Sequence, residues 1–319
     1  MENGETTYAA AGVSLDTAEA VVDRLRAAVE STRTAAMVGG FGGFAGVYAL
    51  DERRYLAAST DGVGTKLILQ RRAGRLREAG VDLAAHCIND VLTCGAEPLF
   101  MLDYVAANRI ELAHVAEMVE GMAATCRAAG CVMLGGETAE LPGIYREQEL
   151  DFAGTCVGLV ERDRFIDGSR IAEGDVVVGL ASAGIHANGF TLVRRLIGEG
   201  DFDADLILPP TRLYLDEVRA LRARADVRGL AHITGGGIPG NLCRVFPGGS
   251  GLGAVIDPAA WEWSPVFQWI ASHGVPEEEM RRVFNLGIGY CAVLPASDVR
   301  PGDVVIGHVE RGVEGVVFA

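Results

Sequence analysis

The chain has 319 residues, of which 49% are hydrophobic and 22% charged, and its formal net charge is −15. This length allows about two hydrophobic cores, and the residue balance excludes an intrinsically disordered chain. The acidic charge opposes non-specific binding to nucleic acid or to anionic membranes, so any phosphate site has to be built locally.

The N-terminal residues, the apolar runs and the cysteines indicate the cellular compartment of the protein. Residues 1–12 contain no basic start and no apolar run, so no secretory signal is visible. No stretch reaches the roughly 20 apolar residues of a membrane helix. The seven cysteines are scattered, and no set of cysteines and histidines has the spacing of a zinc site. We therefore expect a cytoplasmic protein with reduced, buried thiols.

Hydrophobic periodicity and glycine positions predict the elements of the first half. Helices are expected at 15–30, 80–95 and 111–130, and strands at 46–50, 55–60, 97–107, 151–161 and from 131 into a glycine- and acid-rich loop. A glycine loop at 38–46 follows the first helix. The charged, turn-rich segment 161–174 marks a domain boundary, so we predict domains at 1–165 and 166–319.

The second half begins a new set of elements. We expect, in this order, a strand at 175–182, a loop at 183–189, a helix at 190–200, an apolar segment at 230–242, a strand at 254–258, helical stretches between 264 and 284, and an apolar segment at 284–295. Adjacent strand pairs interrupt the alternation of strand and helix. The predicted class is therefore α/β, but a simple doubly wound sheet is not favoured.

Glycine clusters are the first sign of a ligand site. The chain has 42 glycines, about twice the usual ~7%, and they gather beside acidic residues or histidines. The clusters are 39–46, 61–66, 135–143, 184–189 and 234–240. Glycine lets backbone N–H groups converge on an anion. A single glycine loop is weak evidence because turns use glycine routinely, but several beside polar groups point more strongly to phosphate.

Two common nucleotide-binding patterns nevertheless fail. Gly40-x-Gly42-x-x-Ala45 fits the dinucleotide fingerprint, which requires a strand before the loop and a helix after it. Here a helix precedes the loop and a strand follows. The P-loop pattern also fails, because Lys66 is preceded by Thr65 and followed by a leucine.

The segment STDGVGTK, residues 59–66, holds the only lysine among the 28 lysine and arginine residues. Asp61, at the end of a strand, suits Mg²⁺, which takes one or two carboxylates plus phosphate oxygens. Gly62 and Gly64 allow close approach of the backbone. Lys66 offers phosphate a compact ammonium that the broad fork of arginine does not replace. The alternative is a plain turn with a solvated lysine.

Asp90 supplies a second carboxylate within the largely apolar helix 80–95. Its charge is costly there unless it is paired or bound to metal, although solvation on an exposed helix face would also explain it. The neighbouring His86 and Cys87 are interpreted as core or helix-surface residues rather than ligands. Further acidic candidates, with ion pairs or caps as the alternative, are Asp103, Glu137, Glu140 and Asp151.

Two histidines of the second half lie where pockets form. His186 is in the glycine-flanked loop AGIHANG, and His232 ends an apolar strand before three glycines. Histidine is the natural proton handler near neutral pH. A structural hydrogen-bonding role is the alternative for each.

Taken together, these motifs resemble those of the phosphoribosylformylglycinamidine cyclo-ligase family, also called aminoimidazole ribonucleotide synthetases. The chain carries, in this order, GGFGGF, TDGVGTK, CIND, GGETAELPG, GIHANGFTLVRR, PTRLY, HITGGGIPGN and FNLGIGY. The resemblance covers residues 8–295, and DGVGTK together with GGETAE is far more specific than any single glycine loop.

This resemblance implies an ATP- and Mg²⁺-dependent step of purine biosynthesis. Formylglycinamidine ribonucleotide would become aminoimidazole ribonucleotide, with release of ADP and phosphate, through phosphorylation of the formyl amide oxygen and ring closure by nitrogen. It implies an N-terminal domain whose mixed sheet forms a β-barrel across a homodimer, and a C-terminal α/β domain. No nucleic acid or membrane partner is expected.

The resemblance also implies roles for single residues. Lys66, His186 and His232 would be catalytic, and Asp61 and Asp90 would bind Mg²⁺. ATP would be bound by Gly40, Gly42, Gly43, Asp61, Gly62, Gly64, Thr65, Lys66, Asp90, Gly136 and Glu137. Which histidine handles the proton stays open.

The chain departs from the family pattern at Arg26, where members often carry a lysine implicated in nucleotide contact, and in a short C-terminal tail and a trimmed loop after 199. Related ATP enzymes fit less well. Selenophosphate synthetase uses an N-terminal cysteine, whereas the first cysteine here is Cys87. The hydrogenase-maturation relative ends in cysteine, and thiamine-monophosphate kinase lacks GGETAE. A silent nucleotide-binding protein would have lost a carboxylate or Lys66, and all are present.

Overall fold

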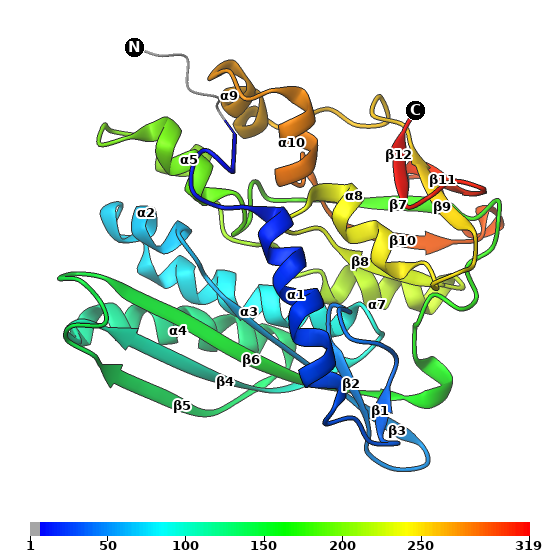
Figure 1. Ribbon diagram of the computed structural model, residues 1–319, viewed down its shortest axis with the longest axis horizontal. Helices are drawn as coiled ribbons and strands as arrows, with labels where there is room; N and C mark the ends of the chain where they lie inside the picture. Colours follow the sequence, from blue (N-terminus) through cyan, green and yellow to red (C-terminus); the bar gives the residue numbers. More distant parts are fainter. Residues whose placement is uncertain (1–6) are drawn as a thin grey trace.

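The computed structural model describes residues 7–319, except for the side chains of residues 15, 16, 18, 19, 22 and 23. It has two α/β domains, each built on a six-stranded mixed sheet (Figure 1). The predicted class, α/β with interrupted alternation, is confirmed. In the part of the chain that is described, no helix is long and apolar enough to cross a membrane.

The sheet of the N-terminal domain has the strand order β1-β2-β3-β6-β4-β5. Its strands are β1 (Met37–Val38), β2 (Gly46–Ala49), β3 (Arg54–Gly62), β4 (Glu97–Ala107), β5 (Val132–Glu140) and β6 (Leu150–Glu161). Neighbours pair antiparallel except β4 and β5. β5 continues through the stretch that the sequence predicted as a loop. There Gly136 lies against Asp103 of β4, where any larger side chain would overlap it.

The sheet of the C-terminal domain has the order β12-β9-β11-β7-β10-β8. Its strands are β7 (Val176–Ala181), β8 (Gly229–His232), β9 (Leu252–Ile256), β10 (Ile288–Leu294), β11 (Val304–Arg311) and β12 (Val316–Phe318). Only β12 and β9 pair in parallel. β10 is buried along its whole length, as expected for a central strand covered on both faces.

The described helices pack beside the two sheets and leave one face of the N-terminal sheet open. They are α1 (Leu15–Glu30), α2 (Lys66–Arg72), α3 (Leu76–Leu92), α4 (Leu112–Ala129), α5 (Phe190–Ile197), α6 (Ala204–Ile207), α7 (Leu215–Arg224), α8 (Gly237–Leu242), α9 (Pro265–Ser272) and α10 (Glu277–Val283). Three short 3-10 turns are η1 (Arg162–Arg164), η2 (Cys243–Val245) and η3 (Ala296–Asp298). Most predicted helices are present, with ends that shift by a few residues.

Helix α3 lies between the two domains. One side packs on α4 and on the N-terminal sheet, and the other meets α7 and β8 of the C-terminal domain. Its apolar side chains share one core with residues of both halves, among them Leu83, Ile88, Tyr214 and Tyr290. The exposed face expected from the sequence is therefore missing over the second half of the helix, because the C-terminal domain covers it.

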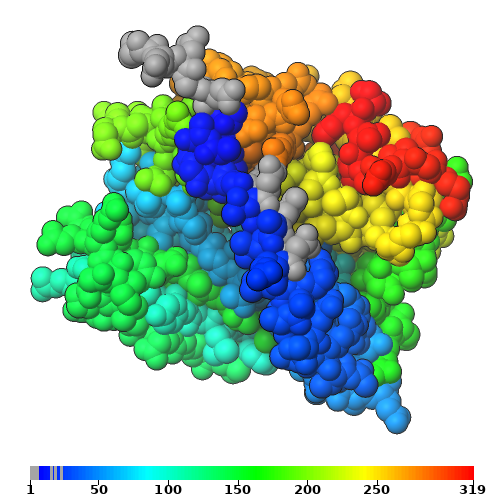
Figure 2. Space-filling view, in the orientation of Figure 1, coloured from blue at the N-terminus to red at the C-terminus, as the bar shows by residue number. Residues whose placement is uncertain are grey.

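The N-terminal segment also joins the domains. In Figure 2 the blue residues run from the C-terminal domain across this face to the N-terminal domain. At one end the amide of Tyr8 donates to Glu279 Oε1 of α10, at 2.5 Å. At the other end the guanidinium of Arg26 in α1 lies 5.8 Å from the centre of the Phe41 ring.

The contact between α3 and α4 yields a stability prediction. A methyl group on Gly80 would overlap the backbone oxygen of Met118, and one on Gly121 would overlap that of Arg77. We expect Gly80→Ala or Gly121→Ala to lower the free energy of unfolding by about 2–3 kcal/mol, because the helices must move apart. Urea denaturation measures this. Gly240→Ala, with open space around it in α8, is the control and should be neutral; equal losses would contradict the close-contact explanation.

Candidate active site

The candidate site is organised by one side of α3. Asp82, His86 and Asp90 follow one another at intervals of four residues, so they lie on the same side of the helix, one turn apart. Asp82 is 0% and His86 2% exposed, and the side chain of Asp90 is 14% exposed. Buried ionisable groups are stable only with partners, and each of these three has a partner on a different element.

The first pair joins Asp61 and His86. Asp61 lies near the end of β3, where its Oδ2 is 3.0 Å from Nδ1 of His86. Its Oδ1 accepts a hydrogen bond of 2.7 Å from the amide of Gly62. The Asp61 side chain stays 38% exposed, so its carboxylate is fixed by the histidine and still reachable from solvent.

The second pair joins Asp90 and His232 across the domain boundary. Oδ1 of Asp90 is 2.8 Å from Nδ1 of His232, which ends β8. Oδ2 accepts a hydrogen bond of 2.9 Å from the hydroxyl of Ser59 in β3. The rings of His232 and His86 meet edge to face, with centroids 4.9 Å apart. Two aspartate–histidine pairs, one from within the N-terminal domain and one shared by both domains, therefore face each other.

The two pairs differ in their electrostatics. Burial lowers the pKa of His86, but the hydrogen bond to Asp61 and the charges of Asp61 and Asp90 outweigh it, so the pKa is raised above 6.5. Burial also lowers the pKa of His232, and the bond to Asp90 offsets only part of this, so its pKa stays below 6.5. For Asp61, burial raises the pKa, but the bond and charge of His86 outweigh it, so the pKa is lowered. As the pH falls, His86 is therefore the first of the two histidines to take up a proton, and His232 stays neutral to a lower pH.

His186 lies close to this cluster, in the loop between β7 and α5. Its φ of 66° is rare for a residue other than glycine. Its Nε2 accepts a hydrogen bond of 3.3 Å from the amide of Ala183, so this nitrogen carries no proton. Burial, followed by the charges of His232 and His86, places the pKa of His186 well below 6.5.

Three buried ring nitrogens have no hydrogen-bond partner in the described part of the chain. They are Nε2 of His86, Nε2 of His232 and Nδ1 of His186. An unsatisfied buried polar atom costs free energy. A ligand that bonded these nitrogens would remove that cost.

Lys66 requires a correction. The sequence predicted an ammonium open to phosphate, but the side chain is 0% exposed. Its Nζ lies 2.8 Å from Asp82 Oδ2 and 2.9 Å from the carbonyl oxygen of Pro209. Burial lowers the pKa of Lys66, and the charge of Asp82 opposes this. Lys66 is the first residue of α2, and its ammonium is bound inside the protein between Asp82 of α3 and the carbonyl oxygen of Pro209.

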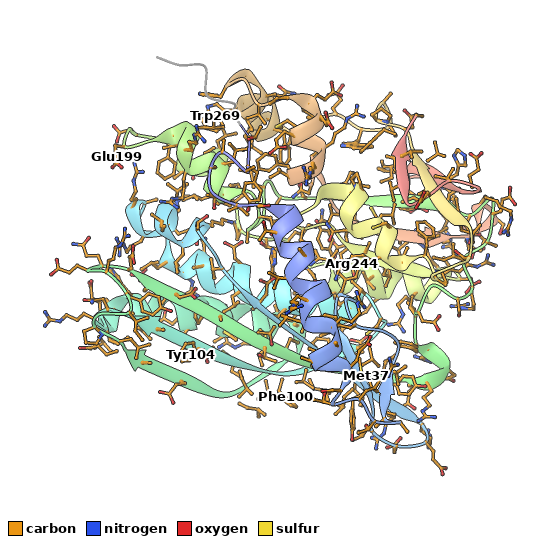
Figure 3. All side chains as sticks on the ribbon, in the orientation of Figure 1. Met37, Phe100, Tyr104, Glu199, Arg244 and Trp269 are labelled. Carbon is orange, nitrogen blue, oxygen red and sulfur yellow. The ribbon has the colours of Figure 1, made fainter. Side chains whose placement is uncertain are left out.

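The glycine loop 39–45 lies beside the Asp90 end of the site. It lines a cavity of about 140 Å³ together with Thr93, three residues beyond Asp90, and Leu230 of β8. Arg244 of the C-terminal domain donates to the carbonyl oxygens of Gly42 and Gly43, at 3.0 and 2.7 Å, and its position is marked in Figure 3. Gly40, Gly42 and Gly43 are thus held near the second pair.

The remaining predicted residues fall into two groups. Gly62 follows Asp61 directly, Gly64 has φ of 68°, and the hydroxyl of Thr65 is 3.1 Å from that of Thr191 in the C-terminal domain. These three lie beside the first pair. Gly136 and Glu137 lie on β5, three strands away from β3, which corresponds to about 14 Å. Within this chain the structure does not bring them to the aspartates.

The next question is whether the acidic residues of the site could bind a metal ion. In the described part of the chain, no group of three or more histidine, cysteine, aspartate or glutamate side chains is placed to hold a metal ion. Mg²⁺ does not need such a group, because it takes one or two carboxylates and completes its shell with water and phosphate oxygens. Asp61 and Asp90 offer oxygen donors of this kind, and one of them is partly exposed.

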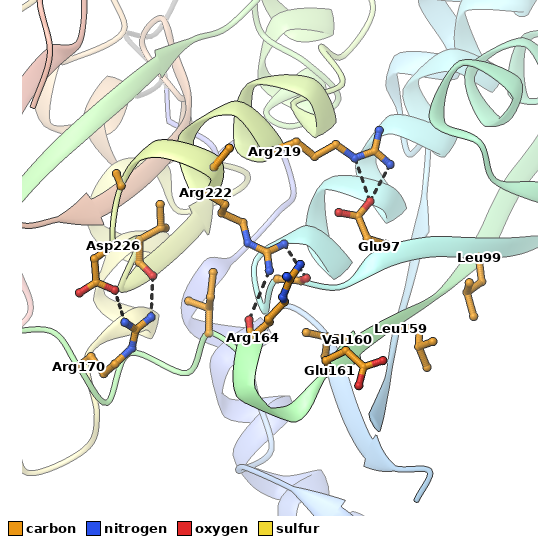
Figure 4. Close-up of a pocket in the computed structure, with 15 residues that line it drawn as sticks. Glu97, Leu99, Leu159, Val160, Glu161, Arg164, Arg170, Arg219, Arg222 and Asp226 are labelled. Carbon is orange, nitrogen blue, oxygen red and sulfur yellow. Dashed lines mark hydrogen bonds and ion pairs between the residues drawn. The ribbon is translucent and has the colours of Figure 1, made fainter. Parts of the chain in front are cut away.

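A separate cavity of about 720 Å³ lies between β4, β6 and α7 (Figure 4). Its lining includes several arginines, but most are already bound. Arg219 pairs with Glu97, Arg170 with Asp226, and Arg222 donates to the carbonyl oxygen of Gly95. It contains none of the residues that the sequence singled out, so we do not place the chemistry there.

Sequence reasoning missed four residues of the site. His86 was interpreted as a core or surface residue, and Asp82, Ser59 and Arg244 were not singled out. The spacing Asp82-x-x-x-His86-x-x-x-Asp90 carried a signal for two of them, because residues four apart share one side of a helix. For Ser59 and Arg244 no comparable signal exists, since their partners are far away in the sequence.

Comparison with known proteins shows the family to which the chain belongs. The chain matches the family described as AIR synthase related protein, with the N-terminal domain at residues 42–160 and the C-terminal domain at 172–318. It is 45% identical over 318 residues to the phosphoribosylformylglycinamidine cyclo-ligase of a Synechococcus strain, covering 94% of this chain and 91% of that protein. It is 46% identical over 308 residues to the enzyme of that name from Thermosynechococcus vestitus, covering 92% and 90%.

Among solved structures, the chain is similar to thiamine monophosphate kinase from Aquifex aeolicus. The TM-score is 0.66 at 17% identity, and the match covers 96% of this chain and 98% of that one. Identity this low shows that the fold is shared and nothing more.

The buried state of His186 predicts a pH effect on stability. Below pH about 6.5 the unfolded chain takes up a proton at this residue and the folded chain does not, so stability falls with falling pH by up to about 1.4 kcal/mol per unit. We expect His186→Asn, which tolerates positive φ, to lack this contribution. The difference in unfolding free energy between the native protein and the variant should therefore shrink from pH 7 to about pH 5 in urea titrations. A difference independent of pH would contradict the assignment.

Proposed function

Since the chain belongs to the AIR synthase related family and matches its cyclo-ligases along more than nine-tenths of its length, we propose that it converts formylglycinamidine ribonucleotide and ATP into aminoimidazole ribonucleotide, ADP and phosphate. The observation that carries this proposal is that two aspartate–histidine pairs face each other at the domain boundary. Acidic groups beside imidazoles suit a reaction that handles a triphosphate and moves protons.

We assign Mg²⁺ to Asp61 and Asp90. Both offer hard oxygen donors, and their histidine partners hold them in place as outer-shell groups do in metal sites. When bound, Mg²⁺ would neutralise charge on the triphosphate of ATP and favour phosphoryl transfer. The backbone at Gly62, Gly64 and Thr65 would lie beside the nucleotide.

The histidines handle protons in this proposal. His232 and His186 are buried and have depressed pKa values, so each is a neutral imidazole. The Nδ1 of His232 donates to Asp90, which leaves its free Nε2 able to accept a proton. The Nε2 of His186 accepts from a backbone amide, so its free Nδ1 carries the proton and can donate a hydrogen bond. We add His86, whose raised pKa makes it the group that keeps Asp61 ionised. Phosphorylation of the formyl amide oxygen would create the leaving group, and loss of a proton from the attacking nitrogen would accompany ring closure.

We also propose that a second copy of the chain covers the open face of the N-terminal sheet. α3 and α4 cover the other face. Side chains in register on the open side include Tyr48, Leu102, Tyr104 and Val132, which are 54%, 42%, 40% and 56% exposed, and Figure 3 shows Tyr104 on the sheet. A sheet face this apolar requires a second layer. Two such sheets would form the barrel that the family resemblance implies.

The dimer gives the remaining predicted residues a place. Strand alternation puts Glu137 on the same open side as Tyr104, its neighbour in register. We propose that Gly40, Gly42 and Gly43 contact ATP within the chain, and that Gly136 and Glu137 contact the nucleotide held by the other copy. Residues 1–165 would then serve ATP binding and dimerisation, and 166–319 would complete the site. None of the cysteines in the described part of the chain forms a disulfide, which suits the reducing cytoplasm.

A direct assay tests the activity. Purified protein with formylglycinamidine ribonucleotide, ATP and Mg²⁺ should form aminoimidazole ribonucleotide, measured by a colour reaction for the aromatic amine. Asp61→Asn should reduce kcat by about 10²-fold or more, because it removes a charge that the triphosphate site requires. Arg77→Met, at the exposed start of α3, is the control and should keep full activity. Absence of product from folded native protein would exclude the proposed reaction.

The dimer has its own test. Leu102→Glu places a charge on the open face and should shift the sedimentation coefficient from that of a dimer to that of a monomer, because a charge buried without a partner opposes association. Leu112→Glu, at an 85% exposed position at the start of α4, is the matched control and should leave the dimer intact. A monomeric native protein would contradict the proposal.

A further inference from the structure

The ion pair of Lys66 and Asp82 lies where neither side chain meets solvent. Both are 0% exposed, with Nζ 2.9 Å from Oδ1 and 2.8 Å from Oδ2. The carboxylate also accepts a hydrogen bond of 2.7 Å from Gln70 Nε2. Two buried charges are tolerated only when their bonding capacity is filled. The contacts that fill it show what the pair does.

Those contacts come from the C-terminal domain. Oδ1 of Asp82 accepts bonds from both the amide and the hydroxyl of Thr211, each 2.7 Å long. Nζ of Lys66 donates to the carbonyl oxygen of Pro209 at 2.9 Å and lies 5.4 Å from the centre of the Phe190 ring. Both charges of the pair therefore bind residues 209–214, the segment that leads into α7.

The same segment is held a second time, nearer to the histidines. Nδ2 of Asn89 in α3 donates to the carbonyl oxygen of Arg212 at 2.8 Å, and the amide of Tyr214 donates to Oδ1 of Asn89 at 3.0 Å. The Tyr214 hydroxyl donates to the carbonyl oxygen of Ala181 at 2.9 Å. Its ring centroid is 6.1 Å from that of His186. Segment 209–214 thus connects α3 with the loop that carries His186.

We propose that Lys66 and Asp82 are a positioning pair, which fixes segment 209–214 on α3 and thereby sets His186 and His232 against Asp61 and His86. The inference rests on the proposed function and adds a role to it. Neither side chain has exposed surface in this structure, so the pair acts on the alignment of the reacting groups. Misplacement by about 1 Å can reduce a rate by about 10²-fold.

The experiment compares three variants. Lys66→Met alone leaves Asp82 without its counter-charge and should lower the melting temperature sharply. Lys66→Met/Asp82→Asn removes both charges and should regain most of that stability. In the double variant we expect kcat to fall by about 10-fold or more, while KM for ATP and for the ribonucleotide stays within about twofold. Arg77→Met/Glu120→Gln, which removes an exposed pair between α3 and α4, is the control and should match the native protein.

Each outcome decides the question. A stable double variant with native kcat would show that the pair serves stability alone and would overturn the proposal. A rise of KM for ATP by about 10-fold or more would mean that Lys66 binds the nucleotide, which also overturns it. If the native protein has no cyclo-ligase activity, the proposed function fails, and hydrogen exchange then tests the pair. The amide of Thr211 should exchange at least about 10-fold faster in the double variant than in the control; equal rates would refute the positioning role.

Discussion

The arrangement of this protein depends on the burial of three ionisable side chains on one side of α3. Asp82, His86 and Asp90 are placed one turn apart in a helix that both domains cover. Burial of such groups costs several kcal/mol each unless partners bond them. Their partners come from α2, from β3 and from β8. Of these three pairs, only Asp90 with His232 crosses the domain boundary, so a shift of the C-terminal domain along α3 would leave Asp90 without its histidine.

The same requirement sets the chemistry of the site. Two aspartate–histidine pairs of similar geometry lie with their rings 4.9 Å apart, so a proton on one ring opposes a proton on the other. Burial lowers the pKa of both histidines. At His86 the bond and charge of Asp61, with the charge of Asp90, outweigh burial and raise the pKa. At His232 the bond and charge of Asp90 do not outweigh burial, and the charge of His86 lowers the pKa further. His86, whose pKa is raised, therefore takes up a proton before His232, whose pKa is lowered.

Much of this could be predicted from the sequence, and what could not has identifiable causes. Local patterns predicted most elements, the mixed class and the carboxylates Asp61 and Asp90, because these signals lie within a few residues of each other. The extent of β5 was missed because its glycines resemble a loop until β4 is beside them. The place of His86 in the site was missed because it depends on the hydrogen bond to Asp61, which only the tertiary structure brings close to it. The role of Arg244 depends on carbonyl groups about 200 residues away, a contact that only the tertiary structure reveals.

The single lysine shows how the two levels combine. A chain that otherwise uses arginine has one position where a compact ammonium is required, and the sequence alone suggests phosphate as the reason. The structure gives a different reason, which also depends on the ammonium of lysine being more compact than a guanidinium. Nζ of Lys66 fits between a carboxylate, a backbone carbonyl and an aromatic ring with no exposed surface. A guanidinium is larger and has five donors to satisfy, more than this closed space provides. The constraint on residue 66 is therefore the size and bonding capacity of a buried cation, and the function that it serves is the alignment of two domains.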